Sequence, residues 1–129
     1  MKRPVTAAGA PAPIGPYSQA IVAGSLVFIS GQIALTSEGN LLSGSVEDET
    51  GQIMKNLQAI LSSAGVGFDD VVKTTVYLTD MSLFPEVNSV YGSYLKEPYP
   101  ARESIGIASL PLGARIEISL IALAPTTAR

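Results

Sequence analysis

Two charged residues in the last quarter of the chain have settings that could serve chemistry. Arg102 follows Pro98 and Pro100, which hold the approach to it extended. Glu117 lies within the strongly apolar run 114–123, and side-chain alternation in a strand places it on a largely apolar face. Carboxylates are rarely left unpaired in such surroundings. The two charges could therefore frame a small polar ligand, or meet partners from another subunit.

The strand-like runs 99–109 and 114–123 flank a Pro/Gly turn, which predicts an antiparallel hairpin. In that register Gly106 lies opposite Glu117 and leaves room beside it. Arg102 then falls on the same face about 13 Å further along, too far for a direct ion pair. For Arg102 alone, an ordinary solvent-facing charge is the simpler interpretation. Glu117 is harder to explain in that way.

The composition predicts one domain, residues 1–129, that associates with copies of itself. Hydrophobic residues make up 47% of the chain and charged residues only 15%, which leaves little charge to cover the surface of a monomer. The net charge of −3, with eight scattered basic residues, makes nucleic acid an unfavourable first choice of ligand.

The residue types that are missing restrict the chemistry further. The sequence has no cysteine and no histidine, so it cannot build a cysteine- or histidine-ligated zinc site, a thiolate nucleophile or a Ser-His-Asp triad. Carboxylates, Arg, Lys, Tyr and Ser remain, and we expect no metal or other cofactor. No signal-peptide pattern or membrane-length apolar run is found, so we expect a soluble cytoplasmic protein.

Hydrophobic periodicity predicts an α+β fold with a mixed sheet of about six strands and two helices on one face. The other face then needs a partner. Within the second strand, Gly31 indicates either a bulge or a place where another group approaches the backbone closely, and the sequence favours neither interpretation over the other. Glu49 is expected on the solvated face of the first helix, and Asn88 by itself is an exposed polar residue. The predicted segments are an extended arm at 1–13, a hairpin of 21–23 and 26–34, helices beginning after Ser45 and near Pro85, a strand at 71–78 and the final hairpin.

Three segments together resemble the Rid (YjgF/YER/L-PSP) family of reactive-intermediate deaminases. They are Ile-Gly-Pro-Tyr-Ser-Gln-Ala at 14–20, Phe-Ile-Ser-Gly-Gln at 28–32, and Tyr-Pro-Ala-Arg at 99–102 followed by the strand at 115–118. The resemblance spans nearly the whole chain. It implies a chorismate-mutase-like fold, a homotrimer whose sheets form a central barrel, and ligand sites in the clefts between subunits.

The resemblance also implies roles for particular residues. Arg102 matches the arginine that holds a substrate carboxylate, and Glu117 matches the glutamate that supports attack by water. Ser104 stands where many members carry cysteine, which keeps a small polar group but excludes any thiol role. The positions that match residues lining the family's cleft are Tyr17, Ser30, Gly31 and Asn88, with Tyr17 expected to assist catalysis.

The implied activity is hydrolysis of enamines or imines such as 2-aminoacrylate, released by pyridoxal-phosphate enzymes, to 2-oxo acids and ammonia. Two alternatives stay open. Some relatives are described as endoribonucleases that inhibit translation, although the acidic charge and the missing histidine disfavour this activity here. A non-enzymatic trimer that binds a metabolite would use the same cleft.

Overall fold

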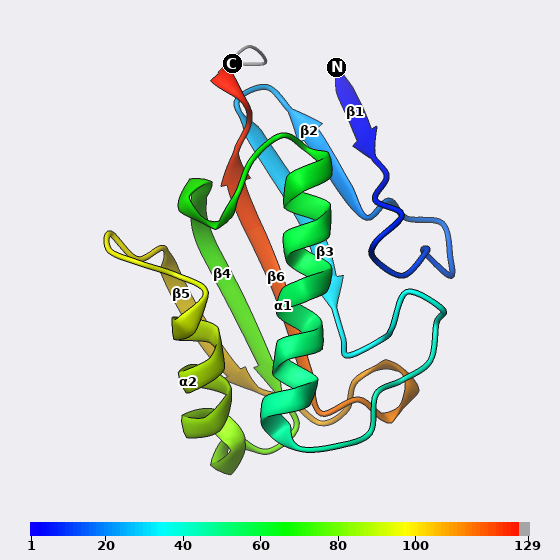
Figure 1. The fold of residues 1–129 in the computed structure, drawn as a ribbon, viewed down its shortest axis with the longest axis vertical. Helices are drawn as coiled ribbons and strands as arrows, with labels where there is room; N and C mark the ends of the chain where they lie inside the picture. The colour runs from blue at the N-terminus through cyan, green and yellow to red at the C-terminus, as the bar shows by residue number, and fades with distance from the viewer. Residues whose placement is uncertain (127–129) are drawn as a thin grey trace.

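The protein's structure, a computed structural model that describes residues 1–126, is a six-stranded mixed sheet with two α-helices on one face (Figure 1). The strand order across the sheet is β1-β2-β3-β6-β4-β5. The predicted α+β class is confirmed. The strands are β1 (Lys2–Val5), β2 (Ala20–Ala23), β3 (Leu26–Gln32), β4 (Val71–Leu78), β5 (Ala101–Gly106) and β6 (Ile116–Leu123). The helices are α1 (Val46–Ser63) and α2 (Phe84–Ser93), with short 3₁₀ turns at Phe68–Asp70, Met81–Leu83 and Pro111–Gly113.

The predicted hairpin between the last two strands is wrong. β6 pairs antiparallel with both β3 and β4, while β5 pairs parallel with β4 at the edge of the sheet. The inner face of β6 is fully buried and its outer face is half-buried. A strand this apolar is most stable at the centre of the sheet, where both of its edges are paired. β5 is mostly exposed and carries charged residues, which suit an edge strand.

The N-terminal half follows the sequence pattern more closely. β2 and β3 form the predicted hairpin, and Gly24 takes the positive φ of 60° that its two-residue turn requires. The arm predicted at 1–13 is partly a strand, because β1 pairs antiparallel with β2. Val5 and Ala7 from this arm are buried in the core.

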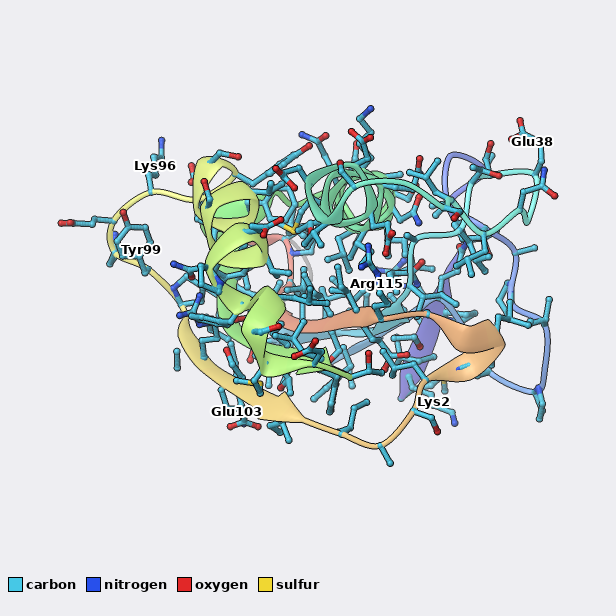
Figure 2. The ribbon with its side chains drawn as sticks, turned by 90° about the horizontal axis from the view of Figure 1, so that it is seen from below. Lys2, Glu38, Lys96, Tyr99, Glu103 and Arg115 are labelled. Atoms are coloured by element: carbon cyan, nitrogen blue, oxygen red, sulfur yellow. The ribbon has the colours of Figure 1, made fainter. Side chains whose placement is uncertain are left out.

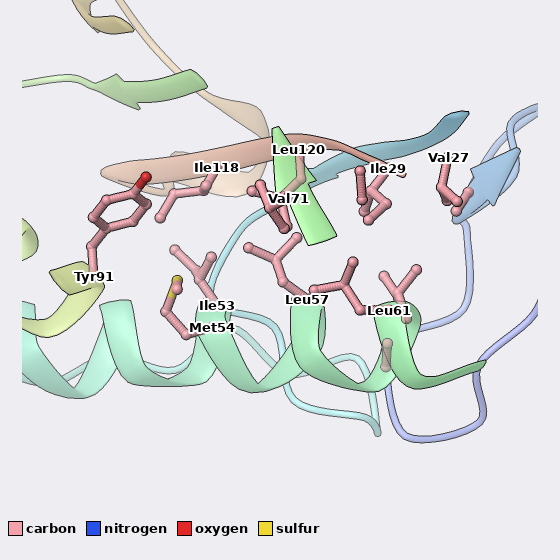
Figure 3. Close-up of a cluster of buried hydrophobic side chains, with 14 of the residues drawn as sticks. Val27, Ile29, Ile53, Met54, Leu57, Leu61, Val71, Tyr91, Ile118 and Leu120 are labelled. Atoms are coloured by element: carbon pink, nitrogen blue, oxygen red, sulfur yellow. The ribbon is translucent and has the colours of Figure 1, made fainter. Parts of the chain in front are cut away.

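The core fills the space between α1 and the sheet (Figure 3). The Ser45 side chain accepts a hydrogen bond from the backbone N–H of Asp48, which caps the start of α1 as predicted. From there the helix presents an apolar stripe that includes Ile53 and Leu57 to the inner faces of β3, β4 and β6. All members of this stripe are buried: Ile53, Met54, Leu57, Ile60, Leu61 and Ala64.

The face of the sheet opposite the helices has no cover among the described residues. Figure 2 shows both helices on one side of the sheet and Glu103 extending from β5 on the other. Phe28 is 43% exposed and Ile105 is 39% exposed on this open face. Ile121 pairs with Phe28 there and is only half-buried. Neither α-helix within residues 1–126 is long and apolar enough to cross a membrane.

Glu49 corrects a second sequence-based expectation, since it is buried rather than solvated. Its Oε2 lies 2.6 Å from Nη2 of Arg115, which also donates to the carbonyl of Gly44. Figure 2 shows Arg115 between α1 and the sheet. The hydrogen bond with Glu49 raises the pKa of Arg115 above its ordinary value, so the guanidinium stays charged. The pair ties the first turn of α1 to the residue that precedes β6.

We predict that Glu49→Ala lowers the free energy of unfolding by about 2 kcal/mol, because it leaves Arg115 without its partner at a partly buried site. Asp69→Ala is the matched control, since Asp69 pairs with Lys96 where the two side chains are 66% and 75% exposed. That change should cost less than about 1 kcal/mol. Chemical denaturation measures both variants, and equal losses would contradict the structural role given to Glu49.

Candidate functional site

A pocket of about 310 Å³ lies beside Glu117 on the open face of the sheet. Its walls come from the segment before β2, the end of β3, the Pro111–Gly113 turn and the start of β6. No basic side chain of the described residues lines it. The lining residues are Pro11, Ala12, Ile14, Tyr17, Gln19, Gly31, Gln32, Ile33, Leu35, Pro111, Leu112 and Glu117.

Gly31 and Glu117 approach each other closely in this pocket. The pairing of β3 with β6 shifts register between Ile29 and Gln32, so Gly31 sits in a bulge. A methyl group built on Gly31 would lie 2.5 Å from Oε2 of Glu117, so the Glu117 side chain would have to move to make room for it. The glycine that makes room for Glu117 is therefore Gly31 and not Gly106. Both interpretations of Gly31, a bulge and a close approach, apply together.

The electrostatic setting of Glu117 is that of a carboxylate without a counter-charge. Glu117 pairs across the sheet with Tyr77, and its side chain is half-buried. Desolvation raises its pKa above the ordinary glutamate value, with no opposing charge or hydrogen bond among the described residues to lower it. Such a group accepts a proton more readily than a solvated carboxylate.

Two further predicted site residues lie on this side, but only one faces the pocket. Tyr17 lines it and is 51% exposed. The Ser30 hydroxyl instead donates to the carbonyl of Ser18 over 2.6 Å, and Ser30 is not among the lining residues. This hydrogen bond fastens Ser30 to the segment that carries Tyr17, and a substrate-binding role for Ser30 stays a prediction.

Arg102 stands at a different place, on the helix-covered side of edge strand β5. Its Nη1 donates to Oδ1 of Asn88 over 2.6 Å, which gives Asn88 a partner that the sequence did not indicate. The guanidinium carbon lies 5.2 Å and 5.1 Å from the ring centroids of Phe84 and Tyr91. Ser104 lies on the same face two residues further along β5. α2 thus holds the guanidinium in one orientation while leaving it exposed.

Arg102 and Glu117 face opposite sides of the sheet, so the predicted common face is wrong. Arg102 is in register with Thr74, which is buried under α2. Glu117 is in register with Tyr77, three residues further along β4 and therefore on the other face. The structure brings Tyr17, Gly31 and Glu117 together in one group. It brings Arg102, Asn88 and Ser104 together in a second.

Two buried amides that the sequence analysis missed hold the pocket walls. The Gln19 side chain accepts from the backbone N–H of Ala7 at 2.6 Å and donates to the carbonyls of Ala7 and Pro11. The Asn56 amide donates to the carbonyl of Leu35 at 2.8 Å. The only sequence signal for Gln19 is its place in the Gly-Pro-Tyr-Ser-Gln segment. Among residues 1–126, no group of three or more acidic side chains is placed to hold a metal ion.

Comparisons with known proteins agree on one family. Residues 7–124 match the family model described as endoribonuclease L-PSP. The human 2-iminobutanoate/2-iminopropanoate deaminase is 46% identical over 95% of this chain and 90% of its own. A solved putative endoribonuclease from Thermotoga maritima superposes with a TM-score of 0.93 at 45% identity, covering 97% of this chain and 99% of its own. The structure of Escherichia coli TdcF with bound serine gives a TM-score of 0.90 at 34% identity, covering 95% and 99%.

We predict that Glu117→Gln raises stability at about pH 7, because it removes a carboxylate whose charged form is disfavoured in the folded state. Because the pKa is raised in the folded state, this cost in folding free energy is fully present at pH values above the folded-state pKa. The penalty fades as the pH falls toward the ordinary glutamate value. The advantage of the variant should therefore shrink toward about pH 4.

Denaturation midpoints at the two pH values test this expectation, with Glu38→Gln in an exposed loop as the matched control. The control should show no such pH-dependent gain. A Glu117→Gln variant that is less stable than the native protein at neutral pH would mean that a favourable partner holds the carboxylate.

Proposed function

The chain belongs to the endoribonuclease L-PSP family, and from this premise we propose that it hydrolyses reactive enamines and imines to 2-oxo acids and ammonia. Glu117 is the observation that carries the proposal. It is a half-buried carboxylate beside a glycine, in a pocket to which the described part of the chain contributes no basic side chain. The human relative's name supports the substrate class, small 2-imino acids. The natural sources of such imines are pyridoxal-phosphate enzymes that release 2-aminoacrylate, and we place the activity in the cytoplasm with them.

The reaction needs orientation and proton transfer rather than a covalent nucleophile. The enamine tautomerises to an imine, whose carbon is already electrophilic. Water adds to that carbon and gives up a proton to Glu117, which returns it to the imine nitrogen to give the carbinolamine. Transfer of the hydroxyl proton to the amine through the same carboxylate then releases ammonia and leaves the 2-oxo acid. The raised pKa of Glu117 improves it as the general base. Tyr17 reaches the same pocket and donates a hydrogen bond to the substrate or the water.

Arg102 binds the carboxylate of the imino acid in this proposal. A guanidinium has five N–H donors in a planar fork that matches a carboxylate. Asn88 engages one of them and the rings of Phe84 and Tyr91 fix the plane, so the remaining donors point in a defined direction. Ser104 lies beside it as a second substrate-binding group. Gly31 and Ser30 complete the site by leaving room for Glu117 and by holding the Tyr17 segment.

The complete site forms between subunits of a homotrimer. Within one chain Arg102 and Glu117 lie on opposite faces of the sheet, so one chain cannot present both to one small substrate. The open face carries exposed Phe28 and Ile105, which support association through that face. Packing the open faces of three sheets around an axis buries these residues and brings the Glu117 pocket of one subunit to the Arg102 edge of the next.

Two other functions remain as outcomes of the test. The family description names an endoribonuclease, but a net charge of −3 and the lack of histidine give RNA little electrostatic attraction and remove the commonest acid and base of nucleases. A metabolite-binding trimer is the other alternative, and the serine bound to the TdcF neighbour supports a small ligand in either case.

The native protein should accelerate the decay of the enamine released by a pyridoxal-phosphate serine or threonine dehydratase. Arg102→Ala should fold, because Arg102 is exposed and fills no core volume. It should lose at least about tenfold in kcat/KM through the missing ionic contact. Glu117→Gln should keep ligand binding and lose about 100-fold in kcat, as expected for a general base.

Absorbance at the enamine band follows the decay, and Lys96→Ala, at an exposed loop position, is the charge-matched control. No acceleration by well-folded native protein would favour the metabolite-binding trimer. A salt-dependent gel shift with RNA would favour the nuclease. Unfolding of Arg102→Ala would make Arg102 a structural residue.

Mixed trimers test whether the site lies between subunits. Arg102→Ala and Glu117→Ala are each expected to be inactive alone. Coexpressed in equal amounts, they should form trimers in which some clefts receive Arg102 from one chain and Glu117 from the other, giving roughly a quarter of native activity. Sedimentation gives the oligomeric state of the same samples. A mixture of trimers that stays inactive would place both residues of each site in one chain.

A further inference from the structure

Leu112 holds a backbone conformation that its side chain disfavours. Its φ of 59° and ψ of 19° lie in the left-handed region, which is uncommon for any residue except glycine and is an outlier for a bulky one. Glycine or asparagine would occupy the position with less strain. The leucine side chain is also 58% exposed, so burial in the core of this chain does not account for it. Strained residues of this kind cluster at ligand sites.

Leu112 forms one wall of the pocket that contains Glu117. Ile14 and Tyr17 line the same pocket and are 74% and 51% exposed. All three come from loops, whereas Gly31 and Glu117 come from the sheet. The pocket therefore has a carboxylate at its sheet side and an apolar rim built from two separate loops.

The charges of the site determine which part of a substrate meets this rim. Among residues 1–126, Glu117 is the only charged one that lines the pocket, and it repels a carboxylate. Arg102, which attracts one, stands on the other side of the sheet. An imino acid held by its carboxylate to Arg102 of a neighbouring subunit, with its imine carbon at Glu117, has its side chain left to contact Ile14 and Leu112.

We propose that Leu112 is a specificity-determining residue, and that it selects imino acids with aliphatic side chains larger than a methyl group. The inference rests on the proposed function and names the substrate class of that site. A pocket of about 310 Å³ supports it, because this is at the lower end of the range that holds drug-sized ligands, roughly 300–1,000 Å³. An alanine-derived imine fills only a small part of that volume.

The neighbours of Leu112 in the turn explain how the side chain keeps its place. Pro111 has a fixed φ, and Gly113 takes a φ of 73° that suits glycine. The proline thus fixes the backbone before Leu112, and the glycine after it adopts a positive φ without a steric penalty. The short turn therefore places the leucine at the pocket in a backbone geometry that local stability does not favour.

Kinetics on two imines test the proposal. An L-amino-acid oxidase with catalase generates the imine from L-alanine or L-leucine, and semicarbazide captures whatever the protein has not hydrolysed. For the native protein, kcat/KM for the leucine-derived imine should at least equal that for the alanine-derived imine. Leu112→Asn should lower the ratio of these two values about tenfold, at the low end of the discrimination that apolar contacts supply.

Leu112→Asn suits the left-handed backbone, so it should keep or raise the thermal midpoint, and Leu112→Gly serves the same purpose if the asparagine variant fails to fold. Leu41→Asn is the matched control, since Leu41 is 38% exposed and does not line this pocket. It should leave the ratio unchanged.

The outcomes separate this inference from the function on which it rests. An unchanged ratio in folded Leu112 variants would overturn the role of Leu112. A native protein that hydrolyses only the alanine-derived imine would overturn the larger substrate class while the deaminase activity stands. A native protein that hydrolyses neither imine, nor the dehydratase-released enamine, would overturn the proposed function itself.

Discussion

The central place of β6 in the sheet is the constraint on which the candidate site depends. Because β6 runs between β3 and β4, the bulge at Gly31 lies against Glu117, and β5 is pushed to the outer edge next to α2. Side-chain alternation then fixes Glu117 on the open face and Arg102 on the covered one. One topological choice thus places the Glu117 group and the Arg102 group on opposite faces of the sheet, which is why the proposed function requires association of subunits.

Loops build the pocket, and buried polar groups give those loops their shape. Gln19 pins the N-terminal arm through both ends of its amide, and Ser30 holds the segment that carries Tyr17. Asn56 reaches from α1 to the carbonyl of Leu35 in the opposite wall. Each bond satisfies a backbone group that a buried loop would otherwise leave without a partner. The apolar core under α1 supports the sheet, while these amides position the walls.

Local patterns predicted the elements well, and long-range pairing is where the sequence was insufficient. The cap at Ser45, the stripe through Ile53 and Leu57 and the strand Val71–Leu78 depend on near neighbours, so they could be predicted. The pairing of the last two strands could not be predicted in this way. Strands adjacent in sequence tend to pair as hairpins, but this tendency competes with the preference of an apolar strand for the centre of the sheet. That error also misassigned the glycine beside Glu117. Glu49 was misplaced for the same reason, since its partner Arg115 is 66 residues away.

Glu49 and Glu117 show how a structural carboxylate differs from a chemical one in the same fold. Glu49 is the more buried of the two, yet both of its oxygens meet the Arg115 guanidinium, so its charge is compensated and inert. Glu117 is less buried, no basic side chain from residues 1–126 lines its pocket, and desolvation raises its pKa. A folded chain gains nothing in stability from that arrangement. A carboxylate that is held without a partner in a ligand-sized pocket does not stabilise the fold, but it can accept a proton from a ligand. These properties favour a catalytic rather than a structural role for Glu117.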